Sequence, residues 1–340
     1  MLFEKFSLRG VEFKNRIFMA PMCMYMAGED AAATDWHYIH YATRAQGGAA
    51  LVMLEAIAVS PEGRITSQDL GLYDEAHLPG LARIVDEIHR MGAKAGVQLA
   101  HAGRKGLSNV PAIYAPSAIA YDDESPTPVA ADEAYIEKTV GDFRAAAERA
   151  ARVGFDLAQL HGAHGYFQGE WLSPLTNKRS DAYGGPAENR VRVLGATLEA
   201  IRSVWPDEKP LGVRVSAEEY EEGGLHPEDV AALLNLVKGK GLDYVDVSSG
   251  GVTPFVPKAS PGYQIPYAKT VKDLTDLPVA GGGLITTPQA AEDVVASGSA
   301  DCVYLGRELL RNPYFPLCAS VALGVDVPWP TAYERAKPRR

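Results

Sequence analysis

The sequence predicts an α/β fold, a single (β/α)8 TIM barrel with an N-terminal β-hairpin cap, and three features support this prediction. Short, uninterrupted apolar runs recur along the chain, as expected for parallel strands that are buried on both faces. Longer amphipathic segments separate these runs, and eight such alternations favour a closed barrel. At 340 residues the chain is long enough for one barrel. An open doubly wound sheet is the alternative, but no predicted strand leads directly into the G-x-G-x-x-G pattern.

The predicted strands follow one another along almost the whole chain. They are residues 17–21, 50–55, 94–100, 157–161, 211–216, 244–248, 278–281 and 302–306. Ahead of them, two short segments, Phe6–Leu8 and Val11–Phe13, flank Arg9 and Gly10. This pattern predicts a hairpin that closes the bottom of the barrel.

Amphipathic segments with helical spacing lie between the strands. The predicted helices include residues 78–91, 135–153, 188–204, 227–240 and 288–297, and several are followed by a glycine suited to a left-handed helix end. The polar, proline-rich stretch from Asn109 to Asp132 predicts a long loop over the barrel mouth. No internal boundary is evident, so we expect one domain over residues 1–340, with a C-terminal arm from about 326 to 340.

Charge and cysteine content exclude several classes of protein. The chain has 33 basic and 43 acidic residues, a net charge of −10, which argues against general affinity for nucleic acid or acidic membranes. The three cysteines are scattered, which indicates neither a disulfide framework nor a metal cluster and favours the reduced cytoplasm. Of these, Cys302 and Cys318 are predicted to be buried packing residues. No signal peptide or membrane-length apolar run is predicted.

Glycines after the last two predicted strands point to a phosphate site. In such barrels functional groups collect at the C-terminal ends of the strands. Gly283 and Gly306 lie there, and bare backbone N–H groups can approach an anion closely. Arg307 would add a charge-assisted contact. The alternative is that these glycines only permit tight turns.

Two histidines and a tyrosine follow the fourth predicted strand. His161 and His164 could bind a metal, serve a structural role, or donate hydrogen bonds to a substrate oxygen that gains negative charge. Glu170 is the only close carboxylate, so we favour the third interpretation and expect no metal. Tyr166 has the high pKa that suits protonation of a carbanion-like carbon. Cys23, at the end of the first strand, could be a core residue or a cofactor contact.

Several ordered motifs together resemble the Old Yellow Enzyme family. They are APMCMY (20–25), VQLAHAGR (97–104), HGAHGY (161–166), LSPLTN (172–177), RSDAYGG (179–185) and ENR (188–190). The resemblance extends from Phe3 to about Arg335. Cysteine at position 23, where other branches carry threonine, is similar to the thermophilic-like class of bacterial ene-reductases.

The resemblance implies a tightly bound FMN over the barrel mouth. Gln98 and Arg214 would bind the pyrimidine edge of the flavin, and Cys23 would tune its reduction potential. The full set of implied cofactor-binding residues is Pro21, Met22, Cys23, Ala56, Gln98, Arg214, Gly283, Gly306 and Arg307.

The resemblance also implies an NADPH dehydrogenase of the ene-reductase type. NADPH or NADH would reduce the flavin, and an α,β-unsaturated carbonyl compound would then take hydride at its β-carbon. His161 and His164 would bind the carbonyl, assisted by Tyr25, and Tyr166 would protonate the α-carbon. Arg335 would reach into the substrate site of a neighbouring subunit, which implies a homodimer or homotetramer.

Some positions depart from the family pattern, and other functions remain open. Gly169 and Trp171 stand where relatives commonly have histidine and phenylalanine, and the tail 336–340 lacks the usual glycine–tryptophan ending. A reductase of quinones or nitro compounds could use the same barrel. A flavin-independent phosphate-binding lyase or isomerase would need a reactive lysine, for which Lys105 is the candidate. A flavin-binding sensor without turnover is a further alternative.

Overall fold

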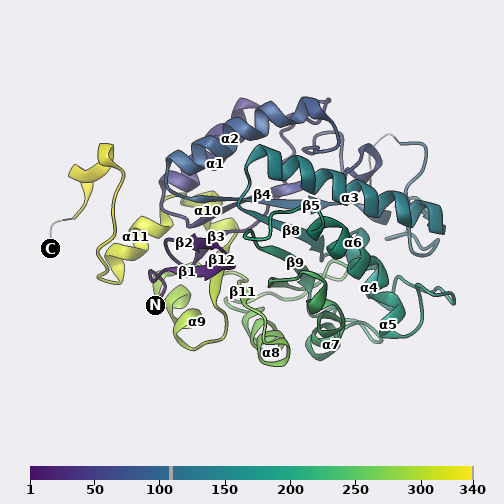
Figure 1. Ribbon diagram of the computed structural model, residues 1–340. Helices are drawn as coiled ribbons and strands as arrows, with labels where there is room; N and C mark the ends of the chain where they lie inside the picture. Colours follow the sequence, from purple (N-terminus) through teal and green to yellow (C-terminus); the bar gives the residue numbers. More distant parts are fainter. Residues whose placement is uncertain (107–109, 339–340) are drawn as a thin grey trace.

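In the residues described by the computed structural model, 1–106 and 110–338, eight parallel strands form a closed barrel (Figure 1). Around the barrel they are β3 (Ile17–Met19), β4 (Leu51–Ala58), β5 (Lys94–Ala100), β8 (Leu157–Gly162), β9 (Leu211–Ser216), β10 (Tyr244–Ser248), β11 (Val279–Gly281) and β12 (Cys302–Leu305). Pairing of β12 with β3 closes the sheet. The predicted (β/α)8 barrel is confirmed, and each predicted strand is present with ends shifted by up to three residues.

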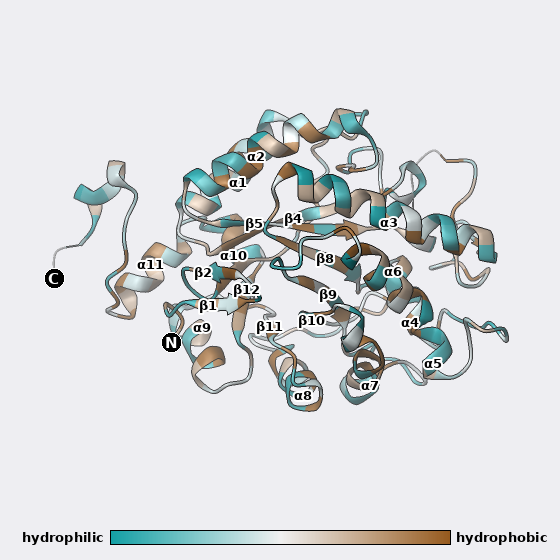
Figure 2. Ribbon diagram, in the orientation of Figure 1, coloured by the Kyte–Doolittle hydropathy of each residue, from teal (hydrophilic) through white to brown (hydrophobic). Residues whose placement is uncertain are grey.

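Helices surround the barrel and cover its outer face (Figure 1). They are α1 (Asp35–Gln46), α2 (Leu78–Arg90), α3 (Glu133–Val153), α4 (Phe167–Leu172), α5 (Ala187–Arg190), α6 (Arg192–Arg202), α7 (Pro227–Val237), α8 (Ile265–Thr275), α9 (Pro288–Ala296), α10 (Arg307–Arg311) and α11 (Phe315–Ala322). Short 3-10 turns add η1 (Pro61–Gly63), η2 (Glu75–His77), η3 (Gly103–Lys105), η4 (Lys238–Lys240) and η5 (Thr331–Ala336). Figure 2 shows hydrophobic and hydrophilic stripes on these helices, as the amphipathic pattern predicts.

The helices differ from the prediction in specific places. The predicted helix 188–204 is divided into α5 and α6 at Val191, and the end of the predicted helix 227–240 is the 3-10 turn η4. Helices α1 and α8 lie outside the predicted segments. The buried face of α1 contains His37, His40 and Tyr41, so a search for aliphatic periodicity does not find it. Gly154, which ends α3, has a φ of 101°, in agreement with the predicted left-handed end.

An aromatic hairpin closes the bottom of the barrel. Strands β1 (Phe6–Leu8) and β2 (Val11–Phe13) pair antiparallel, as predicted. The ring centroids of Phe13 and Phe18 lie 4.9 Å apart, and those of Phe6 and Phe13 lie 6.2 Å apart. Leu8, Val11 and Phe13 join one buried cluster with residues from the barrel strands. This end of the barrel is therefore filled by side chains, and the mouth is left for function.

The segment over the mouth is more ordered than predicted. Strands β6 (Tyr114–Ala115) and β7 (Val129–Ala130) pair in parallel within the predicted loop, whose first residue, Asn109, lies outside the described residues. Arg104 fastens this segment, since its guanidinium donates hydrogen bonds to the carbonyls of Ala120 (3.1 Å) and Val252 (2.5 Å). The loops after β5 and β10 are thereby joined across the mouth.

The C-terminal part contains one wrong prediction. Cys302 is buried, but Cys318 is exposed on α11. Helix α11 turns Phe315, Leu317 and Ala319 inward, which places residue 318 on the outer face. Beyond α11 the arm extends away from the barrel, at the left of Figure 1. Within residues 1–106 and 110–338, every helix is too short or too polar to cross a bilayer.

Candidate active site

Neighbouring strands bring the predicted site residues together at the barrel mouth. Ala56 on β4 is the register partner of Gln98 on β5. His161 on β8 is opposite Arg214 on β9, and Arg214 is opposite Asp246 on β10. Because the strands are parallel, these side chains belong to the same end of the barrel.

A chain of buried polar groups connects these strands. The Gln98 Nε2 donates to Gln159 Oε1 (2.7 Å), and Gln159 Nε2 donates to the Tyr244 hydroxyl (2.7 Å) and to Asp246 Oδ2 (3.3 Å). Asp246 Oδ1 lies 3.3 Å from Arg214 Nε, an ion pair without a hydrogen bond. The sequence analysis did not select Gln159 or Asp246. Their signal is a polar residue with apolar neighbours on both sides in a buried strand, as at Arg214.

The guanidinium of Arg214 has contacts on several sides, but not all of its N–H groups are hydrogen-bonded. Its carbon lies 4.9 Å from the centroid of the Tyr304 ring, and Nη1 lies 3.5 Å from the Pro21 carbonyl. Its buried Nε has no hydrogen-bond partner among the described residues. Asp246 Oδ1, 3.3 Å away, offsets part of the cost of burying this donor. Nη2 makes no hydrogen bond within residues 1–106 and 110–338, so the guanidinium can still donate to an electron-rich group.

His161 and His164 form a compact pair of neutral imidazoles. Their ring centroids lie 5.3 Å apart. Burial, with the nearby charges of Arg214 and Lys105, lowers the pKa of His161 to about 3. Burial and the charge of Arg214 also lower the pKa of His164 well below its usual value. Both rings are neutral at physiological pH and can each present one N–H donor.

Local hydrogen bonds select which nitrogen carries that proton. The Ala163 amide donates to His161 Nδ1 (3.4 Å), so the neutral ring has its proton on Nε2. His164 Nε2 is 2.7 Å from the Ser248 hydroxyl, which itself accepts from Gln264 Nε2 (3.2 Å). Gln264 occupies one lone pair of Ser248, and Ser248 keeps its own proton to donate to His164 Nε2 when the proton of His164 is on Nδ1. In these tautomers one N–H of each histidine is without a partner in the described part of the chain.

The backbone around His164 is fixed in an unusual conformation. His164 has a φ of 59°, and its amide donates to Ser216 Oγ (2.9 Å). Ser216 donates in turn to the Gly250 carbonyl (2.8 Å). A non-glycine residue in the left-handed region costs about 1–3 kcal/mol and persists where its surroundings determine it. The serines thus hold the His164 ring in place.

Tyr166 lies beside this pair with Lys105 near its ring. The Tyr166 centroid is 4.9 Å from that of His161 and 5.0 Å from Lys105 Nζ. Lys105 Nζ also donates to the carbonyls of His164 (3.1 Å) and Gly251 (3.3 Å). Burial raises the pKa of Tyr166 well above its usual value, so the phenol stays protonated. Burial and the charge of Arg104 lower the pKa of Lys105 to about 8.

Cys23 and Tyr25 lie on the segment after β3. Tyr25 has a φ of 56° and is 40% exposed. Burial, with Glu55 and Asp69 nearby, raises the pKa of the Cys23 thiol to about 12. Glu55 also accepts a hydrogen bond from the Met24 amide (3.0 Å) and so anchors the segment. Cys23 is a neutral thiol and is unsuited to nucleophilic attack.

The backbone after β11 is closely packed, and open space lies beside the glycine after β12. A Cβ on Gly282 would lie 2.3 Å from the Tyr304 ring, and Gly283 has a φ of 98° that favours glycine. A Cβ on Gly306 would have only Met22 Sδ (3.5 Å) and Ala20 Cβ (3.8 Å) as neighbours. Gly306 directly precedes α10, whose first residue, the exposed Arg307, adds a positive charge. Backbone N–H groups and an arginine around an open space fit a phosphate group.

Comparison with known proteins agrees with this geometry. The family model described as NADH:flavin oxidoreductase / NADH oxidase matches residues 1–323. The chain belongs to this family.

Individual relatives extend the match over the whole chain. The NADPH dehydrogenases of Geobacillus thermodenitrificans and Listeria welshimeri are 47% and 46% identical to it, each over 98% of both chains. Among solved structures, morphinone reductase superimposes with a TM-score of 0.82 at 25% identity, covering 97% of this chain and 91% of its own. These findings confirm the resemblance to the Old Yellow Enzyme family.

This flavin oxidoreductase carries FMN and takes electrons from NAD(P)H, and its mouth fits that cofactor. The guanidinium of Arg214 and the amide of Gln98 suit the polar edge of a flavin ring, and the glycines after β11 and β12 suit its phosphate.

The two departures from the family pattern have packing explanations. A Cβ on Gly169 would lie 2.9 Å from the Gly162 carbonyl, so helix α4 approaches β8 too closely for histidine. Trp171 is fully buried, and its ring packs against Phe167 and Tyr183. Both differences belong to the packing of α4 behind the site.

The predicted site residue Arg335 does not lie at the mouth of its own barrel. It is exposed on η5 in the arm, which Figure 1 shows apart from the strand ends.

Proposed function

We propose that this flavin oxidoreductase is an NADPH dehydrogenase of the ene-reductase type, which reduces the activated C=C bond of α,β-unsaturated carbonyl compounds. The observation that supports this proposal is the arrangement of His161, His164 and Tyr166. With the proton of His161 on Nε2 and that of His164 on Nδ1, each neutral ring has an N–H donor without a partner among the described residues, and a protonated phenol lies beside them.

The histidines bind the substrate carbonyl in this proposal. As hydride reaches the β-carbon, electron density moves to the carbonyl oxygen, where the two N–H donors stabilise it. Tyr25, with its protonated phenol at the edge of the mouth, reinforces this contact. The donors do not lose protons during the reaction, because both rings are already neutral.

Tyr166 supplies the proton to the α-carbon. Its hydroxyl has no hydrogen-bond partner among the described residues, so its proton is available to substrate. Lys105 lies near enough to stabilise the phenolate that remains. Water can reprotonate Tyr166 before the next turnover.

The cofactor residues are assigned as the sequence predicts. The proposed set is Pro21, Met22, Cys23, Ala56, Gln98, Arg214, Gly283, Gly306 and Arg307. Bound FMN supplies hydride chemistry that links NAD(P)H to the substrate β-carbon. Arg214 places a permanent positive charge at the pyrimidine edge, and the neutral Cys23 thiol adjusts the reduction potential through its contact rather than by covalent reaction.

We also propose an assembly and a location. The chain forms one domain with an arm from about residue 326, and it acts in the cytoplasm as a homodimer or homotetramer. Arg335 would then enter the substrate site of a neighbouring subunit. Support comes from its exposed position on an arm directed away from the barrel (Figure 1).

An anaerobic absorbance titration tests the reaction. NADPH should bleach the yellow flavin band of the purified protein, and cyclohexenone should then restore it with formation of cyclohexanone. Restoration by a quinone or nitro compound but not by cyclohexenone would instead favour a reductase of those electrophiles. A flavin that NADPH bleaches but none of these compounds reoxidises would contradict the proposal.

A further inference from the structure

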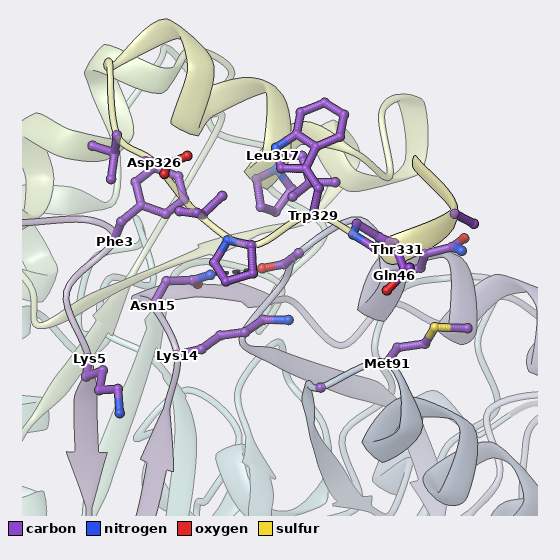
Figure 3. Close-up of a pocket in the computed structure, with 18 of the residues that line it drawn as sticks. Phe3, Lys5, Lys14, Asn15, Gln46, Met91, Leu317, Asp326, Trp329 and Thr331 are labelled. Atoms are coloured by element: carbon purple, nitrogen blue, oxygen red, sulfur yellow. Dashed lines mark hydrogen bonds between the residues drawn. The ribbon is translucent and has the colours of Figure 1, made fainter. Parts of the chain in front are cut away.

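A second cavity lies outside the barrel, on the side of the N-terminal hairpin. Its volume is about 740 Å3 (Figure 3). Three separate parts of the chain form its wall: the N-terminal segment, the ends of α1 and α2, and the segment from the start of α11 into the arm. None of its lining residues belongs to the proposed active site. The volume is typical of a small-molecule site, about 300–1,000 Å3.

Lys14 is the distinctive polar group of this cavity. Figure 3 shows its side chain extending across the floor towards Met91 on the opposite wall. Across residues 1–106 and 110–338 its ammonium makes no hydrogen bond or ion pair. Surrounding protein lowers the pKa of Lys14 to about 8. The side chain is exposed at the cavity, so its ammonium is accessible to an anionic ligand that enters there.

The other charges around the cavity are already neutralised. Lys5 pairs with Glu12 (2.7 Å), and Arg90 pairs with Glu87 (2.5 Å). Asp326, the acidic group of the lining, lies 2.6 Å from Lys337. The unpaired charge at the cavity is therefore a single positive one, on a chain whose net charge is −10. One unpaired cation matches a monoanion better than a polyphosphate.

The remaining wall is largely apolar. Phe3, Met91 and Leu317 contribute to it, and the arm adds several prolines together with Trp329 (Figure 3). Such a surface binds the body of a ligand by removing apolar area from water. The ligand should therefore combine one negative group with an apolar or aromatic body.

From these contacts we propose that the cavity binds a small amphipathic carboxylate, whose charged group pairs with Lys14 and whose apolar body packs beneath the arm. Residues 325–332 form one wall, so a bound ligand bridges the arm and the N-terminal segment. Binding should restrict the arm.

Calorimetry on the FMN-loaded full chain tests the proposal with 4-phenylbutyrate as the probe. The neutral 4-phenylbutyramide is the matched ligand control. We expect the carboxylate to bind about threefold to fivefold more tightly than the amide, because an ion pair with an exposed lysine is weak, and Lys14→Met to remove that difference. Lys5→Met is the matched protein control, because Lys5 is already paired and is directed away from the cavity in Figure 3; its affinity should stay within twofold of wild type.

The active site could also bind the probe, so the location needs a separate readout. Binding at the cavity should leave the flavin spectrum unchanged, survive in His161→Ala, and slow tryptic cleavage after Arg335. Binding that shifts the flavin spectrum, is lost in His161→Ala and persists in Lys14→Met would overturn the proposal. Equal affinities for the carboxylate and the amide would also overturn it, whatever the protein's activity towards enones.

Discussion

The two ends of the barrel are lined by different kinds of side chain. At the bottom, Phe6, Phe13 and Phe18 pack together with aliphatic residues of the strands. At the mouth, His161 and Arg214 are buried with donors that the described residues leave unsatisfied. Burial of unsatisfied polar groups is destabilising, so the mouth cannot be the source of the barrel's stability.

This difference indicates that the two ends of the barrel have separate roles. Apolar packing at the bottom stabilises a closed barrel, and that barrel holds the polar groups of the mouth in fixed positions for a cofactor and substrate. Substitutions at the mouth should therefore alter chemistry more than stability, and substitutions at the bottom should do the reverse. Four experiments examine this contrast.

The largest effect is expected at the mouth. Tyr166→Phe removes one hydroxyl, and general acid catalysis of this kind contributes about 10²–10⁴-fold to rate. Stopped-flow measurement of flavin reoxidation by cyclohexenone should slow by that factor, while flavin reduction by NADPH and the unfolding midpoint change little. If reoxidation is as fast as in wild type, Tyr166 is not the proton donor.

The second experiment removes a core side chain at the bottom of the barrel. Phe13→Ala removes a fully buried ring from the hairpin and should cost about 3–5 kcal/mol of unfolding free energy. Urea denaturation measures this, with Phe255→Ala as a control because Phe255 is 49% exposed. The folded fraction of Phe13→Ala should keep its rate of reoxidation. A selective loss of that rate with stability unchanged would show that the two ends are not separable.

The same contrast explains what could be predicted from the sequence. Continuous apolar runs define the strands, because a parallel barrel buries both faces of each strand. The hairpin follows from short alternating segments around Arg9–Gly10. Helix α1 was missed, since it buries histidines and a tyrosine in place of aliphatic residues. Burial of such groups depends on partners far away in sequence, such as Glu55, which accepts from the Tyr41 hydroxyl (3.0 Å).

At the mouth, the sequence predicted the site residues that lie in strong local motifs. It did not predict the residues that hold those side chains in place. His161, His164 and Tyr166 occur within six residues, so sequence alone groups them. Ser248 and Asp246 come from β10, and only the closed sheet shows that they hold His164 and Arg214. Cys318 was placed wrongly because cysteine is a weak indicator of burial when the orientation of its helix is unknown.

A smaller effect should come from the carbonyl-binding pair. A hydrogen bond to a charged group contributes about 1.5–3 kcal/mol, so His161→Ala or His164→Ala should weaken binding of a phenolate such as 4-hydroxybenzaldehyde about tenfold to a hundredfold. The charge-transfer band of the bound flavin reports this affinity, and FMN content should be unchanged. If phenolate affinity is retained in both variants, the histidines do not bind the substrate oxygen.

The smallest effect is expected from Lys105. With a pKa of about 8, Lys105 is cationic below pH 8 and neutral above it. Its charge lies 5.0 Å from the Tyr166 ring and favours the phenolate left after proton transfer. The rate of reoxidation by enone should therefore fall a few-fold as pH rises through 8, and in Lys105→Met it should be low and flat across that range.

Lys105→Arg separates this charge effect from simple packing. Arginine stays protonated throughout the accessible pH range, so this variant should keep the faster rate and lose the decline near pH 8. A decline that persists in Lys105→Met would assign the titration to another group.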